Sequence, residues 1–113
     1  MVAMSGEVVF RNLRNPPSRI KRNLKRRIRS WVCQHDKEFE KGGLYYSITF
    51  DRHQDPDTQS NSGLECQVNI ISDASFWVGC EMGGNFPQAL SKCLSNMIPM
   101  SELDLIGKER VWV

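Results

Sequence analysis

Positively charged side chains are concentrated in the first third of this sequence. The first 34 residues hold nine basic residues against the single acid Glu7, whereas the remaining 79 hold six basic and twelve acidic residues. The net charge of +2 therefore conceals a charge dipole. A guanidinium can grip an anionic group with two parallel hydrogen bonds, so this segment predicts binding to an acidic polymer or an anionic surface.

Most of these cations fall on one side of a predicted amphipathic helix. Asn15 can serve as the N-cap ahead of Pro16 and Pro17, and apolar residues then recur at steps of three and four to about Gln34. The inner face consists of Ile20, Leu24, Ile28, Trp31 and Val32. The outward residues are Arg19, Arg22, Lys25, Arg26 and Arg29, with Lys21 and Arg27 at the flanks.

The outward stripe has the dimensions and composition of a surface that binds a nucleic-acid strand. With a helical rise of about 1.5 Å per residue, the stripe from Arg19 to Arg29 is about 15 Å long, which matches two or three successive phosphates. A solvated surface usually mixes charges of both signs, as residues 36–41 do. The other RNA-binding residues that we expect are Lys21 at the flank of the helix, Arg14 before it and Lys92 in the second helix.

Two other anionic partners fit a basic helix. A basic amphipathic helix can lie on acidic lipid, but here the apolar side is needed to cover a sheet, so we expect no membrane binding. The other alternative is a protein-interaction adaptor or chaperone whose basic helix binds an acidic protein partner. The sequence has no apolar run long enough to cross a bilayer and no signal peptide at its start, so we expect a cytoplasmic protein.

Histidine and cysteine do not form a convincing catalytic or metal site. Cys33, His35 and His53 lack the second close pair of ligands that a zinc site normally shows. Nor does a glycine-rich motif accompany Cys33 and His35 to stabilise an oxyanion. We therefore expect no enzyme activity, no metal and no cofactor. The cysteines are widely spaced and should be reduced thiols: Cys33, Cys66, Cys80 and Cys93.

The remaining periodicities predict a single α+β domain. Alternating apolar residues or β-rich composition predict strands at 7–12, 44–51, 64–70 and 76–81. We expect a hairpin loop of about eleven residues at 53–63. Asn85 is a plausible N-cap for a second helix that closes near Pro99. The expected order is β-α-β-β-β-α, with two helices packed on one face of a four-stranded, mostly antiparallel sheet.

This order of elements and three local motifs resemble the ribosome hibernation-promoting factor and ribosome-associated inhibitor family, also called ribosomal subunit interface proteins. The similarity covers roughly residues 7–97. The motifs are FRNLRNPPSRI at 10–20, QVNII at 67–71 and NFPQAL at 85–90. The second helix departs from the family's pattern, in which it is basic toward its end, because only Lys92 is basic between Asn85 and Met97.

The resemblance implies a factor that docks on ribosomal RNA of the small subunit, where messenger and transfer RNA would lie. Such a factor inhibits or stores ribosomes under stress and has no catalytic role. Phosphate contacts would fall on Arg19, Arg22, Lys25, Arg26 and Arg29. We expect residues 1–99 to form this domain and residues 100–113 to form a C-terminal tail, whose apolar end packs on the domain or on a second copy as a homodimer.

Overall fold

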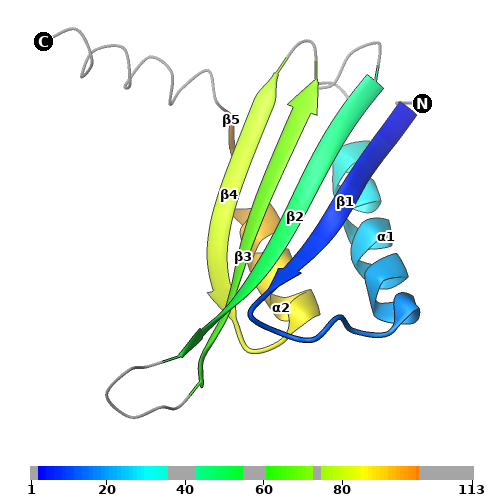
Figure 1. Cartoon of the computed structure of the whole chain (residues 1–113). Helices are drawn as coiled ribbons and strands as arrows, with labels where there is room; N and C mark the ends of the chain where they lie inside the picture. The colour runs from blue at the N-terminus through cyan, green and yellow to red at the C-terminus, as the bar shows by residue number, and fades with distance from the viewer. Residues whose placement is uncertain (1–2, 36–42, 55–60, 73–74, 100–113) are drawn as a thin grey trace, which may run out of the picture.

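The elements follow the order β-α-β-β-β-α-β along the chain (Figure 1). The computed structural model describes residues 3–35, 43–54, 61–72 and 75–99. The strands are β1 (Ala3–Arg11), β2 (Gly43–Gln54), β3 (Asn61–Ser72), β4 (Phe76–Gly83) and β5 (Ile98–Pro99). The helices are α1 (Ser18–Gln34) and α2 (Phe86–Ser95).

The strands form one mixed sheet in the order β1-β2-β3-β4-β5. β1 runs parallel to β2, and the other neighbours are antiparallel. Both helices lie behind the sheet in Figure 1, which leaves the opposite face of the sheet open toward the viewer. The predicted α+β architecture is confirmed, with the two-residue β5 as an additional edge strand.

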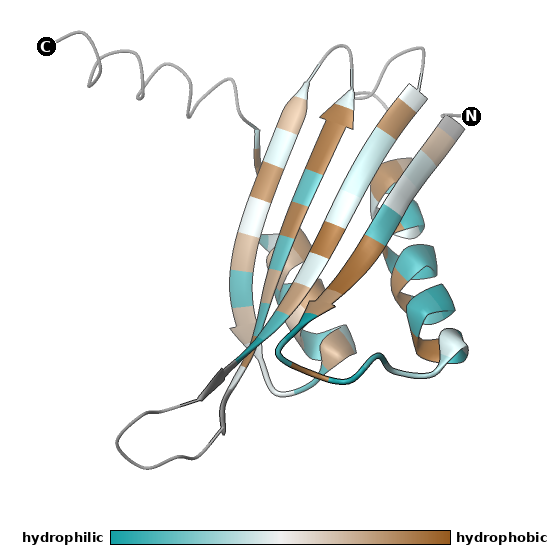
Figure 2. Cartoon of the chain, viewed as in Figure 1, coloured by the Kyte–Doolittle hydropathy of each residue, from teal (hydrophilic) through white to brown (hydrophobic). Residues whose placement is uncertain are grey.

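The core lies between the helices and the inner face of the sheet. Alternate residues of β2 and β3 point inward, because successive side chains of a strand lie on opposite faces. Figure 2 shows the resulting bands of hydrophobic and hydrophilic residues along the strands. The strand residues of the core are Leu44, Tyr46, Ile48, Phe50, Leu64, Cys66, Val68 and Ile70, and they meet Leu24, Ile28, Trp31 and Val32 of α1.

Helix α2 begins and packs as its sequence predicts. The side chain of Asn85 accepts a hydrogen bond of 2.8 Å from the backbone N–H of Gln88, which caps the helix. A glycine at position 83 lets the helix approach β4, because an added Cβ would lie 2.6 Å from backbone atoms of Ala89. Four residues of α2 are buried in the core: Ala89, Leu90, Cys93 and Leu94.

Several predicted boundaries were wrong at the ends of elements. Helix α1 begins at Ser18, and its N-cap is Pro17 instead of Asn15. Pro16 cannot be helical because it precedes Pro17, and a residue that precedes proline is driven out of the helical region. Strand β1 ends at Arg11 since Asn12 adopts a positive φ of 58°. It also starts at Ala3, four residues earlier than predicted, because the parallel ladder with β2 continues to that point.

The connection between β2 and β3 and the end of α2 also differ from expectation. β2 continues to Gln54 and β3 begins at Asn61, so the hairpin pairing takes up part of the predicted loop at 53–63. Residues 55–60 lie outside the described part of the chain, as does the tail at 100–113. α2 ends at Ser95 and not near Pro99, because the chain turns to pair Ile98 with Val78.

Candidate nucleic-acid interface

The exposed side of α1 carries a group of five cations that we call the basic face. Pro17 starts the helix, and burial of Leu24, Ile28 and Trp31 then fixes its rotation about its axis. The opposite side therefore faces solvent. The basic face consists of Arg19, Arg22, Lys25, Arg26 and Arg29, all of which are exposed.

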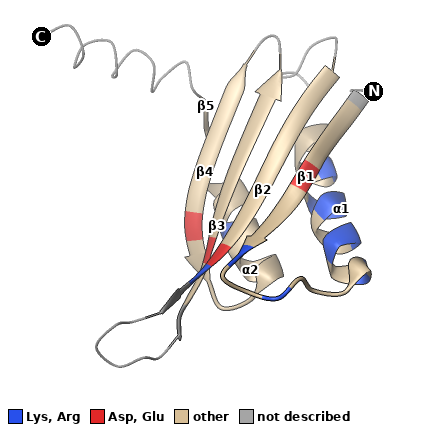
Figure 3. Cartoon of the chain, in the orientation of Figure 1, with Lys and Arg blue, Asp and Glu red and all other residues tan. Residues whose placement is uncertain are grey.

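The acidic residues of the described chain are placed on the strands instead of beside this helix (Figure 3). The Asp51 carboxylate accepts a hydrogen bond of 2.9 Å from the Asn12 amide, and the Glu81 carboxylate accepts one of 3.1 Å from the Asn96 amide. Among the residues that the structure describes, no carboxylate forms an ion pair with the basic face. Its positive charge is therefore uncompensated by these carboxylates.

The two flanking cations of α1 have partners within the domain. The Nζ atom of Lys21 lies 5.6 Å from the centroid of the Phe10 ring, a cation–π contact, and this lysine is half-buried. The Arg27 guanidinium donates hydrogen bonds to Asn23 (2.9 Å) and to Ser91 of α2 (3.4 Å). Lys21, predicted as an RNA contact, is thus turned toward β1, and Arg27 links the two helices.

The two cations predicted outside α1 are both exposed. Arg14 lies in the connection from β1 to α1, just before the basic face, and Lys92 lies on α2, which packs beside α1 (Figure 1). Lys92 is next to Ser91, the residue that receives the hydrogen bond from Arg27. The structure therefore places Lys92 on the helical layer of the molecule, although the neighbouring positions of α2 contribute no further cations.

Two electrostatic details concern the positive charge at the two ends of this helix. The first turn of α1 contains no acidic residue and its N-cap forms no side-chain hydrogen bond, so the positive end of the helix dipole adds to the charge of Arg19. At the other end, Arg29 acts on the phenol of Tyr46. Burial raises the pKa of Tyr46 above its usual value, and the positive charge of Arg29 partly offsets this rise.

Sequence reasoning could not assign Arg11 to a face of the molecule. Arg11 is exposed, but in the parallel ladder it pairs with Asp51, whose side chain belongs to the open face of the sheet. It therefore lies on the side opposite to the helices. Phe50 on β2 is buried, so the next residue, Asp51, and its partner Arg11 on β1 must point to the other face. This orientation can be inferred only when the register between β1 and β2 is known.

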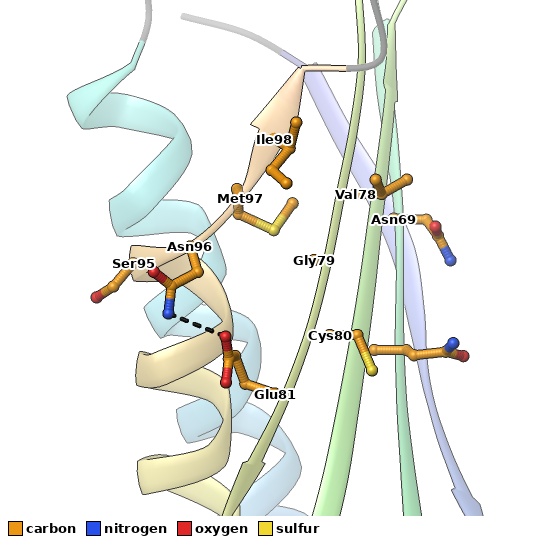
Figure 4. Close-up of a pocket in the computed structure, with 10 residues that line it drawn as sticks. Asn69, Val78, Gly79, Cys80, Glu81, Ser95, Asn96, Met97 and Ile98 are labelled. Carbon is orange, nitrogen blue, oxygen red and sulfur yellow. Dashed lines mark hydrogen bonds between the residues drawn. The ribbon is translucent and has the colours of Figure 1, made fainter. Parts of the chain in front are cut away.

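A concave region lies between the edge of β4 and the end of α2 (Figure 4). This open groove of ≈ 850 Å³ is lined by residues that include Cys80, Glu81, Asn96 and Met97. Burial, followed by the carboxylate of Glu65, raises the pKa of the Cys80 thiol, so the reactive thiolate is disfavoured there. The Glu81 carboxylate is engaged by Asn96. This arrangement gives no support to nucleophilic catalysis.

Of the positions that we considered for a metal, the structure describes the side chains of Cys33 and His35, whereas the side chain of His53 lies outside the described part. The His35 ring stacks on Trp31 with a centroid separation of 4.0 Å, and its Nδ1 lies 2.9 Å from the Trp31 carbonyl oxygen. Within the described ranges, no group of three or more potential ligands is arranged to hold a metal ion. All four cysteines are free, with Cys66 and Cys93 buried.

Neither α1 nor α2 is both long and apolar enough to cross a bilayer. The conspicuous surface feature of the helical layer is thus the uncompensated charge on α1.

In comparisons with known proteins, no protein-family model, no curated protein and no solved structure matches this chain at a significant level.

Proposed function

We propose that the chain binds folded ribosomal RNA of the small subunit through the basic face and thereby inhibits or stores ribosomes. The observation that carries this proposal is the exposure of five cations on one side of α1, with no ion pair to a described carboxylate. The ribosomal target rests on the resemblance of the sequence to hibernation-promoting factors. Phosphate contacts of this kind recognise shape and charge and read no base sequence.

The charge distribution makes the binding orientation specific. Arg22, Arg26 and Arg29 follow one another at helical steps of four and three, so they form a row that can run along one strand of RNA. Of the described acidic residues, Glu7, Asp51 and Glu65 lie at strand positions that point away from the helices, and phosphate would repel them. Glu81 points toward the end of α2, where its carboxylate is engaged by Asn96. The helical layer should therefore face the RNA, while the open face of the sheet points away from it.

Inhibition would follow from occupancy alone. A factor seated where messenger and transfer RNA lie excludes both without making or breaking a bond. Salt should weaken this binding strongly, because each neutralised phosphate releases condensed counterions. If the basic face neutralises about five phosphates, the logarithm of the association constant should fall against the logarithm of salt concentration with a slope of about −3.5 to −4.5. A flat response to salt would contradict the proposal.

The direct test reverses three charges at the centre of the basic face. The Arg22→Glu, Lys25→Glu and Arg26→Glu triple variant should no longer cosediment with small ribosomal subunits. Its thermal unfolding should stay close to that of the wild type or improve, since all three side chains are exposed. The matched control is Lys41→Glu, Lys108→Glu and Arg110→Glu, which changes the net charge by the same amount outside α1.

Retained cosedimentation of the α1 variant would refute the assigned surface. Equal loss in both variants would show that total charge matters and the basic face does not. Treatment of the bound material with RNase distinguishes the remaining alternative, a protein-interaction adaptor or chaperone. Material that is released by RNase supports the proposal, whereas an RNase-resistant acidic protein bound to α1 would replace it.

A further inference from the structure

The open face of the sheet carries an apolar cluster that the proposed function does not use. We call it the outer patch and define it by cross-strand neighbours: Tyr45 pairs with Ile71, Ile71 with Phe76, and Val78 with Ile98. Tyr45, Ile71 and Ile98 are 43%, 43% and 42% exposed, and they are among the most exposed large hydrophobic side chains of the described chain. This cluster lies opposite to the helices and to the basic face.

A hollow beside the outer patch has room for one large side chain. It measures ≈ 350 Å³ and is bordered by residues that include Tyr45, Ile71, Leu44 and Gly43. Gly43 leaves it open, because a Cβ at this position would have no atom within 4 Å. The hollow therefore offers an apolar wall and an unfilled volume at the beginning of β2.

We propose that the chain's own C-terminal segment, residues 100–113, covers the outer patch and places Trp112 in this hollow. The segment follows directly from β5, and Ile98 in that strand is already a member of the patch. Seven of its fourteen residues are apolar, a larger share than the 40% of the whole chain. Trp112 is the aromatic residue of the segment.

The length of the segment is sufficient for this path. From β5 to β2 the chain has to cross three strand spacings of about 4.8 Å, which is about 14 Å. Thirteen residues from Met100 to Trp112 span up to about 43 Å when extended at about 3.3 Å per residue. Trp112 can therefore reach the hollow even if part of the segment is coiled.

The size of the outer patch favours this occupant over a second copy of the chain. Five side chains that each expose less than half of about 150–250 Å² provide roughly 300–400 Å² of apolar surface. A stable dimer typically buries about 800 Å² on each partner, twice what the patch supplies. A tethered segment needs less area, because the preceding strand already holds it at a high effective concentration.

Trypsin provides the test in the full-length protein, because Lys108 and Arg110 are cleavage sites within the segment. Mass spectrometry follows only the C-terminal products. A synthetic peptide of residues 100–113 in the same buffer gives the rate for an unprotected chain. Cleavage of the protein should be slower by about tenfold or more, since burial of even one large apolar side chain shifts the open population by that factor.

Two variants should remove this protection independently. Ile71→Asp places a charge in the outer patch, and Trp112→Ala empties the hollow; in both, cleavage should approach the rate of the peptide. The matched control is Gln67→Asp, an exposed position four residues before Ile71 on the same face of β3, which does not border the hollow. It should keep the wild-type protection. Circular dichroism verifies that each variant is folded.

Three results would overturn the proposal. Cleavage of the wild type as fast as the peptide would show that the segment is not docked. Equal effects of Ile71→Asp and Gln67→Asp would show that the patch is not the site. Protection that disappears on dilution, together with a dimer mass in sedimentation, would assign the patch to a second copy. The proposal does not depend on RNA binding, which occurs on the other layer of the molecule.

Discussion

Replacement of Arg26 by glutamate should stabilise the isolated protein while it weakens binding to RNA. Arg26 lies at the centre of the basic face, four residues after Arg22 and three before Arg29. Residues at these spacings are neighbours on a helix, so both pairs are repulsive in the free protein. No described carboxylate forms an ion pair with Arg26 that would offset this repulsion.

The size of the effect follows from the two pairs. Each like-charge pair costs about 0.2–0.5 kcal/mol, and an opposite pair gains a similar amount, so Arg26→Glu should stabilise by about 0.8–2 kcal/mol at low salt. A change of 1 kcal/mol shifts the Tm of a domain of this size by about 4 °C. Arg26→Gln is the matched control and should give about half of the gain, because it removes repulsion without adding attraction.

The assay is thermal unfolding by circular dichroism at about 20 mM and about 1 M salt, since the Debye length falls to about 3 Å at the higher concentration. The gain should be clear at low salt and nearly absent at high salt. In parallel, the salt dependence of RNA binding should lose about 0.7–0.9 from its slope in the Arg26→Gln variant, which corresponds to one phosphate contact.

A lower Tm for Arg26→Glu at low salt, with Arg26→Gln unchanged or also lower, would refute the reasoning. It would mean that the guanidinium of Arg26 is already neutralised by a carboxylate of its own chain. The basic face would then be a structural ion-pair surface, and its proposed role in RNA binding would lose its physical basis.

Three further predictions concern the start and packing of α2 and the surroundings of Cys80 on β4. Gly83→Ala should destabilise by about 1–3 kcal/mol in chemical denaturation, because its Cβ would meet the backbone of α2 at 2.6 Å; an unchanged midpoint would show that the helix can shift freely. Asn85→Ala should cost about 1 kcal/mol through loss of the bond to Gln88, and Asn85→Ser should recover most of it; equal stability of all three proteins would contradict the cap. Alkylation of Cys80 by iodoacetamide should reach half its maximal rate at a higher pH than that of free cysteine, because a raised pKa depletes the thiolate at any lower pH; a midpoint at or below that of free cysteine would be inconsistent with the partial desolvation of this thiol and the nearby carboxylate of Glu65.

The sequence predicted the periodic parts of the fold well. The 3.6-residue repeat from Ile20 to Val32 and the strict alternation from Leu44 to Phe50 each allow one way to bury the apolar side, and the structure uses it. Tyr46 shares the buried side of this strand with Leu44, Ile48 and Phe50, whereas its neighbour Tyr45 is exposed. Local periodicity is sufficient here because burial of an apolar face outweighs the finer preferences of single residues.

The ends of elements could not be predicted in the same way. β5 contains only Ile98 and Pro99 and exists because β4 offers an open edge beside the end of α2. The extension of β2 and β3 into the predicted loop likewise depends on pairing between strands and not on the residues of either strand alone. Such pairings are long-range, so a local pattern contains no signal for them.

In the candidate site, too, the sequence determined some features and only the tertiary structure determined others. The amino-acid sequence by itself determined that α1 would expose Arg19, Arg22, Lys25, Arg26 and Arg29, because its apolar stripe fixes which side of the helix faces the sheet. Only the tertiary structure decided what surrounds these cations: it turned Lys21 onto Phe10, joined Arg27 to α2, and placed Arg11 on the opposite face. Rotation of a helix about its axis depends on its own residues, whereas the neighbours of each charge depend on how distant segments pack.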